Sequence, residues 1–547
     1  MEKQSNWYNW RYGKKEEVKQ ETNEAVRKLA DTIAAIKSQA SKEDEREQKI
    51  QVSDVAGALA FLYEKLRTIV DNKEERLLRK YAIERILKRR LLIEGTSKNI
   101  GLALIQELIH AHYLSNKMVP EKKVEEVQSI INKYIYLKDR VMVLDKNKGG
   151  KDMEKWLVGL MACEIEVKLR EENYEQAMVE FMYSIVKDDL LFPKNMEENE
   201  KKLQILIAAQ RVLAKADRMI SNYFIFRLYY PEWPRAGEKL IDEVAANLSL
   251  LRETIDQQMY HPMQEKIFII LQKEVIIYNI LAETILANPG EAREIISDPE
   301  RLANEVKKIC AKRHKYAKGK LGRAAFRSII YIFATKMVLA IGIEVPIDRY
   351  ILQEGINWQA IVVNVVFPPL YMFFLALSIR MPLAKNTDKI TAGIKGLVYT
   401  DVKRTTYKIK PPARSLVKQF VFSSVYSVIT AAIFFGIITG LLRLRFNAVS
   451  IVIFLVFLSL VSFFGMIIRR SSRESIIYRQ KEAVLTSVVD FFFLPIINMG
   501  RWLSFKFSQI NVFIFFFDFI VEAPLKIFIQ FLEEWFSFLK EKKEEIY

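Results

Sequence analysis

Residues that commonly build metal and catalytic centres are scarce in this 547-residue chain. Its two cysteines, Cys163 and Cys310, exclude a disulfide framework of the kind that staples small secreted folds. Among its four histidines, His110 and His112 lie two residues apart on an expected helix, where their side chains point about 200° away from each other. We therefore expect neither a metal site nor a cofactor.

The motifs of the common enzyme classes are also missing. The chain has no GxxxxGK[ST], no strand-borne GxGxxG, no HExxH, no GxSxG and no CxxC pair. Residues 1–14 are polar and aromatic and lack the apolar core of a secretory signal, so we expect them to form a polar N-terminal arm. We do not expect an enzyme.

Charge is distributed unevenly along the chain. The formal net charge is +17, from 83 Lys/Arg and 66 Asp/Glu. Residues 301–547 hold 35 Lys/Arg and 16 Asp/Glu, whereas residues 1–300 hold 48 and 50. The basic character therefore belongs to the C-terminal part alone, which indicates that this part contacts an anionic partner.

Residues 15–300 have the pattern of a helical domain. Apolar residues recur at helical spacing, and turn-forming residues such as Gly149-Gly150 and Asn288-Pro289-Gly290 separate the stretches. Strand-like alternation is nearly absent. We predict an all-α fold in which these residues form a cytoplasmic multi-helix bundle.

An irregular helical repeat is the alternative for this domain. Asn173–Ala177, followed by Phe181 and Pro193, resembles the second helix of a tetratricopeptide unit. The resemblance covers about twenty residues and fails in the preceding helix, where Ile165 replaces the small residue. No second copy follows at the expected period, so we favour an irregular bundle.

Four C-terminal segments are long and apolar enough to cross about 30 Å of hydrocarbon, which takes about 20 residues. They are residues 328–345, 358–379, 420–442 and 448–468. The last three contain no charged residue, and the first contains Lys336 near its centre. We predict a polytopic α-helical transmembrane region over residues 328–468, preceded by a basic juxtamembrane segment over residues 301–327.

Loop charge predicts the orientation of these spans. Residues 301–327 carry ten Lys/Arg and one acid, and the loop 380–418 carries ten Lys/Arg and two acids. The loops between them, 346–357 and 443–447, carry one and two basic residues. Because positive charge favours the cytoplasmic side, we predict a multi-pass protein of the cell membrane with both termini in the cytoplasm.

The basic segments also predict contact with anionic lipid headgroups. The residues concerned are Lys312, Arg313, Lys315, Lys318, Lys320, Arg323, Lys403, Arg404, Lys408 and Lys410. The same residues could neutralise nucleic-acid phosphates, but their position next to membrane spans favours lipid.

The C-terminal end is less regular. Residues 484–521 contain two short apolar runs interrupted at Gly500, which predicts a re-entrant or spanning hairpin. Residues 522–547 predict an amphipathic helix followed by a charged cytoplasmic tail.

Polar residues at membrane depth are costly and are candidate functional residues. The candidates are Lys336, Glu344, Asn364 and Asp490, and we expect Pro368 and Pro369 to break or kink the second span beside them. Such a group could form a midplane transport site. Alternatively, Lys336 pairs once with a carboxylate and serves only the assembly of the spans.

Two functions are compatible with these observations. We favour an integral membrane protein whose cytoplasmic helical domain is an interaction or scaffolding platform for other proteins. The alternative is a transporter or channel subunit with its polar site around Lys336. Membrane lipids and proteins are the expected partners, a homo-oligomer is compatible with the sequence, and nucleic acid is not expected.

Overall fold

A computed structural model describes residues 22–44, 49–52, 75–93, 100–144, 150–170, 174–194, 196–352, 357–377, 384–399, 406–409, 416–473, 484–509 and 535. Apart from two strands of two residues each, every named element in this part of the chain is a helix, which confirms the predicted all-α fold. The chain forms two compact units. We call them the helical unit, which comprises residues up to Leu302 together with Lys395–Pro412, and the apolar unit, which comprises Ala303–Ile394 and Ala413–Val521.

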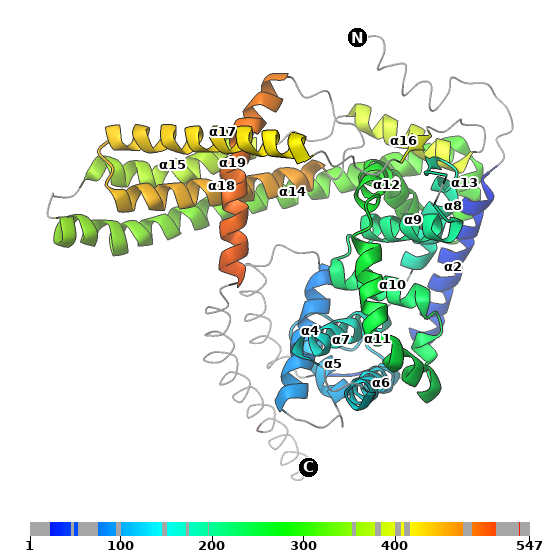
Figure 1. The fold of residues 1–547 in the computed structure, drawn as a ribbon. Helices are drawn as coiled ribbons and strands as arrows, with labels where there is room; N and C mark the ends of the chain where they lie inside the picture. The colour runs from blue at the N-terminus through cyan, green and yellow to red at the C-terminus, as the bar shows by residue number, and fades with distance from the viewer. Residues whose placement is uncertain are drawn as a thin grey trace, which may run out of the picture. The chain divides into compact units, whose positions relative to one another are not determined.

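The helical unit is built from helices on short connections (Figure 1). Its helices are α2 (Glu24–Asp44), α4 (Glu75–Ile93), α5 (Ile100–His110), α6 (Lys122–Leu144), α7 (Lys151–Lys168), α8 (Glu175–Val186), α9 (Glu198–Leu213), α10 (Arg218–Tyr229), α11 (Glu238–Met259), α12 (Gln264–Ala287) and α13 (Ala292–Ser297), with the short turn η1 (Trp233–Arg235). One group, α4 to α7 with α10 and α11, shares a single hydrophobic core. A second group packs α2, α8, α9, α12 and α13 together.

Helix α11 shows why these segments form helices. Its buried residues are Ile241, Val244, Ala245, Leu248, Leu251 and Ile255, which recur every three or four positions and so line one face. Burying a Leu or Ile side chain stabilises the fold by about 1.5–3 kcal/mol, so packing of this face dominates the stability of the helix.

Part of the long basic loop is packed into the helical unit. The hydroxyl of Tyr399, which is 2% exposed, donates to the carbonyl of Ile296 at 3.0 Å. The amide of Asn23 donates to the carbonyl of Val398 at 2.7 Å. Strand β2 (Tyr407–Lys408) lies parallel to strand β1 (Leu190–Leu191). This segment is therefore part of the helical unit rather than a free arm.

Among the described residues, four helices are long and apolar enough to cross a membrane, as predicted. They are Pro299–Tyr350, which begins in the helical unit and continues into the apolar unit, and Trp358–Leu377, Gln419–Arg443 and Ala448–Arg469 of the apolar unit. The corresponding elements are α14 (Pro299–Leu339) with the π-helical segments η2 (Ala340–Glu344) and η3 (Ile347–Leu352), α15 (Trp358–Leu377), α17 (Leu416–Arg443) and α18 (Ala448–Arg473). Helix α16 (Ala384–Val398) precedes the segment that joins the helical unit, and α19 (Val484–Gln509) packs against α18.

Helix α14 joins two segments that the sequence suggested were distinct. The basic residues 301–327 and the apolar residues that follow form one helix without a break. No proline lies between Glu300 and Leu339, so nothing in the sequence interrupts the backbone hydrogen bonds.

Pro368 and Pro369 were expected to break or kink the second span; they do not break it, because α15 is a single helix that contains both. The fixed φ of proline is compatible with a helix, and apolar surroundings with neighbouring helices tolerate the lost hydrogen bonds. Both prolines are buried within the unit.

The expected interruption at Gly500 is also absent, because α19 continues through it. A Cβ at Gly500 would lie 1.9 Å from the carbonyl oxygen of Ser459 on α18. The glycine therefore permits close helix packing instead of ending a helix. The rest of the expected hairpin, residues 510–521, and nearly all of residues 522–547 lie outside the described residues, as does the arm over residues 1–14.

Candidate functional site

Four buried polar side chains meet inside the apolar unit. Lys336 on α14 donates from Nζ to Oδ1 of Asn364 on α15 at 3.3 Å. Asn364 donates from Nδ2 to Oε2 of Glu344 in η2 at 2.8 Å. The hydroxyl of Ser450 on α18 lies 3.5 Å from the same carboxylate oxygen. We call these four residues the polar cluster, and it joins three of the four apolar helices.

The charges of the polar cluster are fully removed from solvent. The side chains of Lys336 and Glu344 are both 0% exposed, and the distance from Nζ to Oε1 is 3.9 Å. The ammonium also lies 4.4 Å from the centroid of the Phe457 ring on α18. A charge at the centre of a span costs about 2.5–3.5 kcal/mol on insertion scales, and pairing it with a counter-ion offsets part of this cost.

Asn364 makes the ion pair geometrically specific. Its amide accepts from the ammonium and donates to the carboxylate, so each charged group has a hydrogen bond of the matching kind. Oε1 of Glu344, by contrast, has no hydrogen-bond partner and is held only by the longer contact with Lys336. The arrangement fits an ionised pair bridged by an amide.

A second polar group fixes the neighbouring helix ends. Asn447 accepts from the amide of Ser450 at 2.7 Å and donates to Asp348 at 2.5 Å. The side chain of Asn357 accepts from the backbone amide of Ala360 at 3.1 Å. The backbone amide of Asn357 donates to the Asp348 carboxylate at 3.5 Å. Each asparagine therefore caps one apolar helix and ties it to the segment η3.

Three of the four residues predicted at membrane depth, Lys336, Glu344 and Asn364, thus come together. The side chain of Asp490 is not among the described ones. Ser450 and Asp348 were not predicted, because Glu344 lies 106 positions from Ser450 and Asn447 lies 99 positions from Asp348. The only local signal for Ser450 is the Asn-x-x-Ser pattern at 447–450, which is typical of a helix N-cap.

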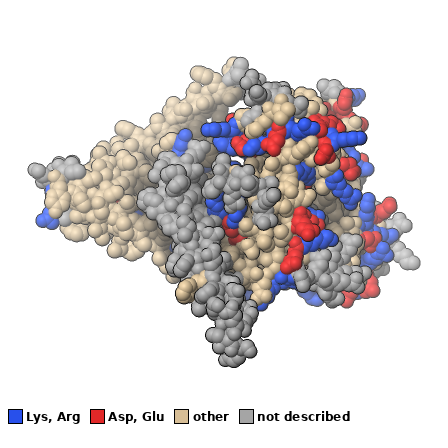
Figure 2. Space-filling model, turned by 90° about the horizontal axis from the view of Figure 1, so that it is seen from below, with Lys and Arg blue, Asp and Glu red and all other residues tan. Residues whose placement is uncertain are grey.

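The predicted lipid-contact residues fall into two sets. On α14, the side chains of Lys312, Lys315, Lys318 and Arg323 are exposed, and that of Arg313 is partly exposed. Lys408 is exposed on β2, whereas Lys403, Arg404, Lys410 and the side chain of Lys320 lie outside the described residues. On the face shown in Figure 2, charged side chains gather over the helical unit, and few are seen on the apolar helices.

The helical unit has a buried polar group of its own around Glu164. Its carboxylate accepts from Lys133 at 2.5 Å, from the hydroxyl of Tyr134 at 3.0 Å and from the indole of Trp233 at 2.9 Å. Trp233 is 0% exposed and its ring meets that of Tyr134 edge to face. Burial lowers the pKa of Lys133, although the Glu164 carboxylate opposes this. Every charged atom here has a partner, which indicates a role in holding α6, α7 and η1 together.

A second buried ion pair joins α4 to the start of α10. Nζ of Lys80 lies 3.2 Å from Asp217, which also accepts from the backbone amide of Ile220 and the hydroxyl of Tyr81. Burial alone would raise the pKa of Asp217, but Lys80, the Ile220 amide and Tyr81 together hold it below its ordinary value. The pair is therefore ionised at neutral pH.

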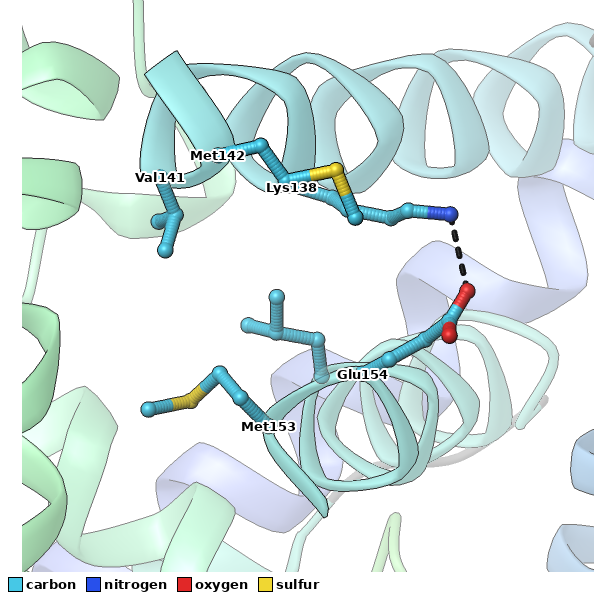
Figure 3. A pocket seen from close by; sticks show the side chains of 6 residues that line it. Lys138, Val141, Met142, Met153 and Glu154 are labelled. Atoms are coloured by element: carbon cyan, nitrogen blue, oxygen red, sulfur yellow. Dashed lines mark hydrogen bonds and ion pairs between the residues drawn. The ribbon is translucent and has the colours of Figure 1, made fainter. Parts of the chain in front are cut away.

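A small pocket lies between α6 and α7 (Figure 3). Lys138 and Glu154 form an ion pair of 2.8 Å at one side, and Val141, Met142 and Met153 line the rest with Leu157. Its volume of about 10 Å³ is enough for about one water molecule and excludes a larger ligand. Among the described residues, no group of three His, Cys, Asp or Glu side chains could hold a metal ion.

No protein-family model, no curated protein and no solved structure matches this chain.

Proposed function

We propose that this chain is an integral membrane protein that holds its helical unit at the cytoplasmic face as a platform for binding other proteins. The observation that carries this proposal is the packing of the Lys395–Pro412 segment into the helical unit. The apolar runs of the first two apolar helices lie between Leu302 and Lys395. Two crossings return the chain to the side from which it started, so the helical unit and this loop share one side of the membrane.

The charge of the flanking segments supports the cytoplasmic side. Both segments that adjoin this unit, 301–327 and 380–418, are strongly basic, whereas the loops at the other ends of the helices are not. In this proposal the hydrogen bonds of the polar cluster hold α14, α15 and α18 in one arrangement. Interhelical hydrogen bonds of this kind stabilise packing in membranes by about 0.6–2 kcal/mol each.

The platform proposal is tested with the full chain, because a fragment that ends near residue 320 would lack part of the helical unit. The protein is purified from native membranes in mild detergent, and its partners are quantified by mass spectrometry. Variants with single exposed apolar residues replaced, Val143→Asp (74% exposed) and Leu250→Asp (65% exposed), probe two faces of the helical unit. A stoichiometric partner that one of these variants loses, and that Lys336→Met retains, supports the proposal. Recovery of the protein without any partner contradicts it.

Transport through the apolar unit is the second candidate function. It is favoured by one observation, the convergence of Lys336, Glu344 and Asn364 at membrane depth. Its test is solute or ion flux in vesicles reconstituted with the full chain. Lys336→Met should abolish flux that the matched variant Lys318→Met retains, and equal flux in both would exclude this function.

A further inference from the structure

The continuity of α14 determines which of its basic residues can reach a membrane. The apolar run begins at Ser328, and the helix extends without a break back to Pro299. A helix rises about 1.5 Å per residue, so Arg327 and Arg323 have their Cα atoms about 1.5 and 8 Å from the start of that run. Lys315 and Lys312 lie about 20 and 24 Å from it.

Electrostatic contact with a membrane has a limited range. Headgroups extend about 7 Å beyond the hydrocarbon, and charges are screened over about 8 Å at physiological salt. Only residues within about 15 Å of the start of the apolar run are then attracted strongly. A tilt of about 40° brings Lys315 to about 15 Å, the limit of this range, but leaves Lys312 about 18 Å away, outside it. Lys307, about 32 Å from the run along the helix, lies farther out still.

The two arginines also have suitable positions on the helix. They are four residues apart, so they lie on one face, and both are exposed. The guanidinium of Arg323 lies over Gly319, with Nη1 3.2 Å from where a Cβ of that glycine would be. The absence of a side chain at Gly319 lets the guanidinium lie along the helix, directed away from the apolar run.

We infer that the binding site for anionic lipid headgroups on α14 is centred on Arg323 and Arg327, the two exposed basic residues nearest the apolar run, and that Lys307 and Lys312 take no part in it. The inference rests on the proposed membrane crossing of α14 but not on the identity of any protein partner. A guanidinium suits this role because its fork of donors matches the oxygens of a phosphate.

The test uses the full chain in mild detergent, titrated with fluorescent phosphatidylglycerol and, as the neutral probe, fluorescent phosphatidylcholine. Each basic residue near an anionic headgroup contributes about 1 kcal/mol, so Arg323→Gln/Arg327→Gln should weaken phosphatidylglycerol binding about 30-fold. Lys307→Gln/Lys312→Gln removes the same charge from exposed positions of the same helix, outside this range, and should change the binding less than about 3-fold. Arg323→Lys/Arg327→Lys should retain most of the binding because it retains the charge.

Three results would overturn the inference: equal weakening by the two glutamine pairs, no weakening by the arginine pair, or equal affinity of the native chain for both lipids. The thermal midpoint of each variant shows whether it is folded. Labelling of the crossing with a thiol reagent, described below, distinguishes a failure of this inference from a failure of the proposed topology.

Discussion

Removal of the Lys336 charge is the most informative change in the apolar unit. Lys336→Met leaves the Glu344 carboxylate buried without a counter-ion, since both side chains are 0% exposed. Leaving one partner of a buried ion pair uncompensated costs about 3–5 kcal/mol. At about 2–4 °C per kcal/mol, the thermal midpoint in detergent should fall by roughly 10 °C.

Removal of both charges should restore most of this loss. In Lys336→Met/Glu344→Gln, the glutamine still accepts the hydrogen bond that Asn364 donates at 2.8 Å to Glu344. The remaining loss of stability, about 1 kcal/mol, comes from the hydrogen bond that Lys336 no longer donates to Oδ1 of Asn364. The double variant should therefore be more stable than Lys336→Met by about 2–4 kcal/mol.

The assay is thermal unfolding of the full chain, with Lys318→Met as a matched control. This lysine lies on the same helix but is exposed, so its loss should change stability by less than about 0.5 kcal/mol. The reasoning fails if Lys336→Met is as stable as the control, or if the two changes in the double variant simply add.

Three further predictions concern packing and charge in the two units. Tyr399→Ala should destabilise the helical unit by about 3–5 kcal/mol and expose the adjoining loop to proteases, because this ring is buried; unchanged proteolysis would contradict the packing of the loop. Asp217→Asn should cost about 1–3 kcal/mol at pH 7 through the lost pairing with Lys80. The pKa of Asp217 in the folded chain lies below its ordinary value of 3.8, so the stability advantage of the native chain over Asp217→Asn is complete above that pH and disappears as the pH falls through the lowered pKa. Denaturant midpoints of both chains between pH 2 and 7 measure this difference, and a difference that does not change with pH would refute the prediction. Gly500→Ala should lower the thermal midpoint through a clash with α18, whereas Gly440→Ala, where a Cβ meets open space, should not; equal midpoints would exclude the close packing of α19.

The sequence predicted the features that follow from composition and periodicity. Three of the four apolar helices are recognisable because an uncharged run of about 20 residues has few alternatives, and the first is recognisable although its run contains Lys336. Lys336 and Glu344 could be proposed as a site because charges at membrane depth require partners. Both predictions can be made without knowledge of which residues are in contact in the folded chain.

The features that the sequence analysis missed depend on contacts between distant residues. Pro368 and Gly500 are helix breakers by local propensity, but tertiary packing overrides propensity in α15 and α19. The packing of Tyr399 against Ile296 joins residues 103 positions apart, and no local pattern indicates it. Ser450 could not be predicted as part of the polar cluster either, because its contact with Glu344 depends on which helix α18 packs against, and no local sequence pattern indicates that.

The central claim, a helical unit held at the cytoplasmic face, is tested most directly by the position of introduced thiols. The native thiols are unsuitable reporters because Cys163 and Cys310 are buried, and burial raises the pKa of Cys163. In a background with both replaced by alanine, Glu198→Cys (87% exposed) reports on the helical unit and Tyr350→Cys (73% exposed) on the segment η3 at the C-terminal end of the first apolar helix.

A reagent that does not cross membranes is applied to intact cells and then to permeabilised cells. The account predicts that the thiol at position 350 is labelled in intact cells, and that the thiol at position 198 is labelled only after permeabilisation. Labelling of position 198 in intact cells, or protection of position 350 there, would contradict the proposed topology and with it the platform at the cytoplasmic face.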